Sequence, residues 1–135
     1  MKAVNEITEG KKVYALIYSA DMKADGVRFL TPQNYPLQVG LLEHPKGHKV
    51  KPHRHPSLKY NVSTTQEFLY IEKGSVEATI YRNDWTVLKK VKLNKGDFAL
   101  FVAGGHSFKM LSKCRIIEIK QGPYPGDKKA KIFMD

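Results

Sequence analysis

Short apolar runs, each closed by turn residues, recur along the whole chain. The segments between them are rich in the Gly, Pro, Asn and Asp that turns require. No run keeps the i, i+3, i+4 apolar spacing of an amphipathic helix, so any helix should be short. The pattern predicts an all-β protein with strands in the ranges 13–18, 27–30, 37–43, 67–72, 75–81, 85–93, 97–103, 107–111 and 114–119.

Alternation of apolar and polar residues predicts the buried faces of two of these strands. Val76, Ala78 and Ile80 share one face of their strand, with polar residues between them. Val91 and Leu93 alternate with lysines in the same way. Evenly spaced short strands of this kind are typical of a β-sandwich or a barrel.

Length and composition favour one globular domain over residues 1–135. The chain has 135 residues, of which 41% are hydrophobic and 27% charged, and we find no repeat or linker that divides it. Residues 124–135 are expected to form a loose tail or to pack on a neighbour. The single cysteine, Cys114, cannot form an internal disulfide, and we find neither a signal peptide nor an apolar span. We therefore expect a cytoplasmic protein with no membrane partner.

The formal net charge of +10 raises the question of nucleic-acid binding. Most lysines are spread along the chain, and no helix-turn-helix, zinc-finger or RNP-like pattern is visible. The exception is a basic cluster around two histidines: Lys46, Lys49, Lys51, Arg54 and Lys59. Positive charge focused in this way favours a small anionic ligand, such as a phosphate or a carboxylate, over nucleic acid.

Three histidines and one glutamate form the candidate site. His53 and His55 are two residues apart, so on a strand they would project from one face. Glu67 opens a later apolar run, and the glycines of AGGHSF deliver His106 to the start of another strand. Imidazoles with one carboxylate suit a divalent transition metal. Residues 108 and 110 would share a face with His106, as an apolar wall for a ligand or as simple core.

The spacing of these residues resembles the two motifs of the cupin family. The first motif is matched, with its five-residue and six-residue intervals, by Gly47, His53, His55, Glu67 and Gly74. The second is matched by Gly96, Gly104 and His106. The resemblance covers a motif core over residues 47–110. It implies a double-stranded β-helix, a jelly-roll barrel of two antiparallel sheets that binds one divalent metal ion, such as Fe, Mn, Zn or Ni. Carried over by position, the ligands would be His53, His55, Glu67 and His106.

The sequence departs from the family pattern in three places. Residues 56–66 separate His55 from Glu67, a longer interval than the family shows; they would form either part of a lid over the site or only a long loop. Val102 stands where the second motif has proline. His106 also comes one residue early after Gly104, and Met110 stands where some members carry a downstream Asn. None of these departures removes a ligand.

The resemblance implies metal chemistry without selecting a reaction. We expect an enzyme, an isomerase, epimerase or dioxygenase, that acts on a small anionic metabolite such as a sugar phosphate, a nucleotide sugar or a carboxylate. Glu67 and His106 would be catalytic, and Lys51, Phe108 and Met110 would bind the substrate. Two alternatives stay open: a binding barrel without turnover, and a metal-free sugar epimerase or isomerase whose histidine base is held by a carboxylate. Barrels of this class commonly pair through an edge strand, so we expect a homodimer, with residues 13–18 as a candidate for that edge.

Overall fold

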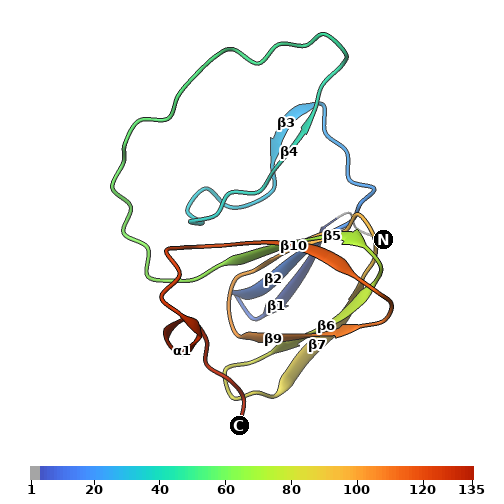
Figure 1. Ribbon diagram of the computed structural model, residues 1–135, viewed down its shortest axis with the longest axis vertical. Helices are drawn as coiled ribbons and strands as arrows, with labels where there is room; N and C mark the ends of the chain where they lie inside the picture. Colours follow the sequence, from blue (N-terminus) through green and yellow to red (C-terminus); the bar gives the residue numbers. More distant parts are fainter. Residues whose placement is uncertain (1–3) are drawn as a thin grey trace. The chain divides into compact units, whose positions relative to one another are not determined.

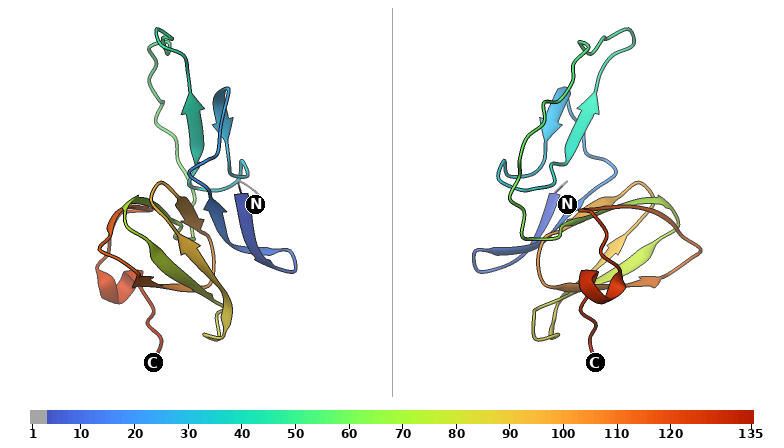
Figure 2. Two further views of the ribbon diagram at one scale, coloured as in Figure 1. Left: turned by 90° about the vertical axis from the view of Figure 1, so that its right-hand side faces the viewer. Right: turned by 60° about the vertical axis from the view of Figure 1, so that its left-hand side comes forward.

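The computed structural model describes residues 4–135, which form two compact units (Figures 1 and 2). Unit 1 contains the chain up to Met22 and from Thr65 onward, and unit 2 contains Lys23–Thr64. Each unit is described by itself. The predicted single domain over residues 1–135 stays a prediction.

The described residues of unit 1 form eight strands and one short helix. They are β1 (Val4–Glu9), β2 (Lys12–Tyr18), β5 (Glu67–Lys73), β6 (Val76–Tyr81), β7 (Val87–Leu93), β8 (Phe98–Phe101), β9 (Gly105–Met110), β10 (Arg115–Lys120) and α1 (Asp127–Ala130). Unit 2 contains β3 (Gly26–Phe29) and β4 (Gly40–Glu43), which pair antiparallel as a two-stranded sheet. The expectation that any helix is short is confirmed for the described residues. None of their helices is long and apolar enough to cross a membrane.

Two antiparallel sheets form the layers of unit 1. One has five strands in the order β1-β2-β8-β5-β10, and the other has three in the order β7-β6-β9. Figure 1 shows β5 and β10 in the layer that faces β6, β7 and β9. The predicted all-β class and the two antiparallel sheets are confirmed, but the sheets do not close into a barrel. The double-stranded β-helix therefore stays a prediction.

The core of unit 1 contains the residues whose alternation predicted it. Val76, Ala78 and Ile80 on β6 are completely buried, as is Leu93 on β7. Ile71 on β5 belongs to the same core cluster. Both predictions of buried faces are confirmed.

The prediction that residues 13–18 form an edge strand is wrong. These residues lie in β2, which pairs with β1 on one side and β8 on the other. An apolar run like this one is suited to the interior of a sheet. When a strand pairs on both sides, neither its faces nor its edges remain exposed to water. The edge strand on that side is β1. The sequence did not predict β1, because its buried apolar residue, Ile7, stands among polar neighbours. The homodimer itself stays a prediction.

The prediction that His53 and His55 lie on a strand is also wrong. Residues 44–66 contain no strand. Pro52 and Pro56 flank the two histidines, and neither proline has the N–H that a strand ladder needs. The side chains of residues 44–65 in this segment are exposed.

Candidate functional site

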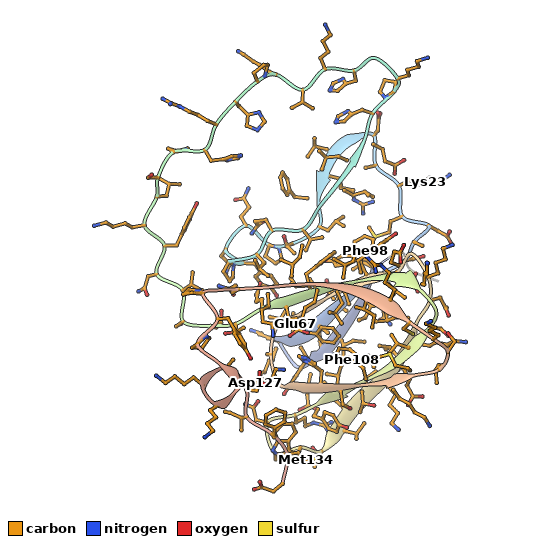
Figure 3. The ribbon with its side chains drawn as sticks, in the orientation of Figure 1. Lys23, Glu67, Phe98, Phe108, Asp127 and Met134 are labelled. Atoms are coloured by element: carbon orange, nitrogen blue, oxygen red, sulfur yellow. The ribbon has the colours of Figure 1, made fainter. Side chains whose placement is uncertain are left out.

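Glu67 and His106 come together on the facing sides of the two sheets of unit 1. Glu67 opens β5 and His106 is the second residue of β9. The Nε2 atom of His106 lies 3.6 Å from Oε1 of Glu67. The side chains of His106 and Glu67 are 28% and 15% exposed, so both remain partly accessible to water. Figure 3 shows Glu67 and Phe108 labelled between the sheets. The sequence analysis assigned these two residues to one site, and in the structure they are in contact.

Two glycines place His106 at the start of β9. Gly104 has a φ of +68°, and a Cβ atom there would come within 2.6 Å of the Tyr14 ring. A Cβ on Gly105 would lie 2.7 Å from the ring of Trp85. Any other residue type at either position would force a shift of the backbone or of an aromatic side chain. The expectation that this glycine pair delivers His106 to a strand start is confirmed.

Strand alternation turns Glu67 toward the core. Leu69 and Ile71, two and four residues further along β5, are 3% and 0% exposed and share its face. The strand register sets Phe101 of β8 directly beside Glu67 on one side and Lys120 of β10 on the other. Glu67 is thus a carboxylate at the end of an apolar row, a position that needs polar partners.

Aromatic rings form a wall beside the pair. The Phe101 and His106 ring centroids are 4.6 Å apart, and those of Phe101 and Phe108 are 5.5 Å apart in an edge-to-face arrangement. Phe108 packs against the core cluster, whereas Met110, near the other end of β9, is 51% exposed. Of the two apolar residues named from the sequence, Phe108 lies next to His106, with the two ring centroids 5.3 Å apart.

Two charged residues of the site were missed by the sequence interpretation. Lys120 pairs with Glu67, and Glu118 pairs with Leu69, so both side chains share the inner face of the sheet. Lys120 Nζ lies 3.4 Å from Glu118 Oε1. The orientation of these two residues was not apparent in the run RIIEIK. Alternation alone would turn Ile117 and Ile119 inward, whereas their side chains are 45% and 54% exposed.

The surroundings of Glu67 lower its pKa. Burial alone would raise that pKa, since it penalises the charged carboxylate. The hydrogen-bonding and charge interactions with His106 act in the opposite direction, and Glu118 and Lys120 add to them. The net effect is a pKa below the ordinary value, so Glu67 is an anion at neutral pH.

His53 and His55 lie in unit 2, with ring centroids 5.3 Å apart in an edge-to-face arrangement. Nδ1 of His53 lies 2.8 Å from the backbone oxygen of Lys51. A carbonyl oxygen can only accept, so Nδ1 carries the hydrogen, and in the neutral ring Nε2 is the nitrogen with the lone pair. Lys51, predicted to bind substrate, is exposed in the same segment.

The donor set fits a divalent metal ion in its chemistry. Glu67 and His106 offer an anionic oxygen and an imidazole nitrogen on facing strands. His53 already has the arrangement typical of a metal ligand, in which the second ring nitrogen donates to a backbone carbonyl. Within residues 4–135, no three His, Cys, Asp or Glu side chains are grouped closely enough to hold an ion. The structure thus describes the two pairs of predicted ligands separately, one pair in each unit.

Comparisons of this chain with protein-family models, with curated proteins and with solved structures found no match. The residues of the chain and their geometry are therefore the basis for a functional proposal.

Proposed function

We propose that this chain is a metal-binding protein of the cupin type that acts on a small anionic metabolite. The ion would be Fe, Mn, Zn or Ni, with His53, His55, Glu67 and His106 as its ligands. The observation that supports the proposal is the contact between Glu67 and His106, because residues from the two separate motifs face each other across an antiparallel pair of sheets. A metal held in this way would act as a Lewis acid toward a carbonyl or hydroxyl oxygen of the substrate.

The chain's own residues would bind and orient the substrate. Phe101 and Phe108 offer an apolar surface next to the charged pair, suited to the face of a sugar ring. Glu67 is held as an anion, so its carboxylate oxygen can ligate the ion, and it would accept a proton from the substrate only when it detaches from the ion. The 28% exposure of His106 leaves the pair within reach of a ligand. These features favour isomerase or epimerase chemistry.

Metal content tests this proposal. The full chain is reconstituted with each of the four metals, dialysed and assayed for bound metal per chain. We expect near-stoichiometric metal in the parent and its loss in Glu67→Gln and in the His53→Ala, His55→Ala double variant. His44→Gln serves as the control, because His44 is an exposed histidine of the same unit as His53. A parent that binds no metal, or a control that loses as much as the ligand variants, would contradict the proposal.

The same contact supports a second candidate, a metal-free epimerase. An imidazole held by a carboxylate can act as the base that removes a proton from carbon, and His106 beside Glu67 has this arrangement. Incorporation of solvent deuterium into sugar phosphates distinguishes the two candidates. Exchange that survives removal of metal by a chelator and is lost in His106→Gln would favour the metal-free reaction, whereas exchange that requires the ion would favour the metal enzyme.

A further inference from the structure

Lys120 brings a positive charge to the inner face of the five-stranded sheet of unit 1. It ends β10 directly beside Glu67, and its side chain is 24% exposed. The basic residues at positions 46–59, from which the sequence predicts an anionic ligand, belong to unit 2. Lys120 is thus a cation that the strand register itself places at the Glu67–His106 pair.

We propose that Lys120 binds the anionic group of the ligand, a phosphate or a carboxylate, and that Glu118 occupies this lysine when the ligand is absent. The inference deepens the proposed function and rests on it, since it assigns a substrate-recognition residue to the same site.

Glu118 has the properties of an exchangeable partner. Its carboxylate offers Lys120 the same anionic oxygens that a ligand would, at a separation of 3.4 Å. The Glu118 side chain is 43% exposed, so its carboxylate can leave Lys120 and be hydrated by water instead. An ion pair as open to solvent as this one contributes little to stability, and a ligand can displace it at small cost.

Lys120 is held in place from two sides. Its Nζ atom lies 5.4 Å from the centre of the Tyr124 ring, a cation–π contact, and the Tyr124 hydroxyl contacts Asp127. The next residue, Gln121, fixes the backbone: its N–H donates to the Gln66 oxygen at 3.2 Å, and its Oε1 accepts from the Gln66 N–H at 3.0 Å. A cation held in this way loses less freedom when it binds an anion.

The location of Lys120 matches the chemistry expected of the substrate. Phe101 is the neighbour of Glu67 on the β8 side, and Lys120 is its neighbour on the β10 side. A ligand with its ring on the aromatic wall and its anionic group on Lys120 would present the atoms between them to Glu67 and His106. This arrangement suits sugar phosphates and sugar acids.

Anion titration of the full chain tests the inference. Inorganic phosphate, and acetate in a second arm, are titrated at constant ionic strength, and affinity is read from backbone amide NMR shifts around β5 and β10. Phosphate binding with no acetate binding would identify the ligand group as a phosphate; binding of both would extend the class to carboxylates. The titrations are run on metal-free and on metal-loaded protein. Lys120→Met and Glu118→Gln are compared with Lys109→Met, an exposed lysine on β9 whose removal changes the net charge equally.

We expect opposite effects of the two site variants. Lys120→Met should weaken phosphate binding about tenfold or more, as for a lost hydrogen bond to a charged group. Glu118→Gln should strengthen it several-fold, because the competing carboxylate is gone. Lys109→Met should leave it unchanged, and Lys120→Arg should largely restore it.

The failure of this inference is distinguishable from failure of the proposed function. Parent-like phosphate affinity in Lys120→Met, weaker binding in Glu118→Gln, or no anion binding by the parent would overturn the inference. Metal content is measured on the same samples. If the parent binds no metal, the proposed metal centre would be overturned. The phosphate data would still decide the role of Lys120.

Discussion

Glu67 is a carboxylate in a row that otherwise faces the core. Leu69 and Ile71 continue its face of β5, and both are almost completely buried. A charge at such a position is stable only when its neighbours compensate for lost hydration. His106 and Lys120 provide this compensation from different strands, so three elements of unit 1 converge on one ionised side chain.

Removal of His106 should reverse the pKa shift of Glu67. In the parent, a carboxyl ¹³C titration should give a pKa below the ordinary value of 4.5. In His106→Gln that pKa should rise, since burial is the largest single influence and it acts upward. His44→Gln serves as the control and should leave the titration unchanged. An unchanged Glu67 pKa in His106→Gln would show that the two side chains are not coupled.

The direction of this shift fixes its effect on stability. A carboxyl whose pKa is lower in the folded state stabilises the fold at pH values above 4.5. That contribution is lost as the pH falls from 4.5 through the folded-state pKa. Free energies of unfolding measured against pH should therefore fall less steeply in Glu67→Gln than in the parent over that acid range.

At the scale of elements, the start of β9 depends on Gly104. Its positive φ and its closeness to the Tyr81 backbone oxygen and the Tyr14 ring both exclude a Cβ atom. We predict that Gly104→Ala lowers the free energy of unfolding by about 1–3 kcal/mol and disturbs the His106 amide signal. The measurement is urea denaturation combined with amide NMR.

Gly10→Ala is the matched control for that variant. Gly10 also has a positive φ, of +60°, but a Cβ there would meet no atom within 4 Å. The control therefore carries the backbone strain without the contact with Tyr14, and it should cost less and leave His106 unchanged. Equal costs for the two variants would mean that the close approach of the Tyr81 backbone oxygen and the Tyr14 ring to Gly104 is unimportant.

The elements differ in how far the sequence could predict them. Val76 and Ile80 alternate strictly with polar residues, so their strand and its buried face were predictable. Glu118 and Lys120 were not, because their orientation depends on the pairing of β10 with β5, a long-range contact that local alternation does not encode. The prediction of a strand around His53 was wrong for two reasons. The alternating residues there are not apolar, and the flanking prolines lack the N–H groups that strand pairing needs.

At the scale of the whole molecule, the proposed ligands belong to different units. His53 and His55 lie in an exposed segment of unit 2, and Glu67 and His106 belong to unit 1. The proposed metal centre therefore has a consequence for the entire chain. Binding of the ion should change the behaviour of the segment that contains His53 and His55, which is distant in sequence from His106.

Trypsin should report this link. Arg54 and Lys59 are exposed in chain without strand pairing, and neither is followed by proline, so we expect early cleavage there. Bound metal should slow that cleavage in the parent by ordering the segment between the histidines and Glu67. The measurement is mass spectrometry of timed digests, with and without metal.

Glu67→Gln is the informative variant in that assay. It alters a residue of unit 1 and leaves every trypsin site of unit 2 intact. The protection by metal should disappear in it. Equal protection in the parent and the variant would show that the ion binds unit 2 without Glu67.

The most direct test of the account is a crystal structure of the full chain loaded with metal. We predict one ion with His53, His55, Glu67 and His106 as its protein ligands, each at about 2.0–2.2 Å. An ion held by other residues, or bound to Glu67 and His106 with the two histidines of unit 2 apart from it, would contradict the proposed centre.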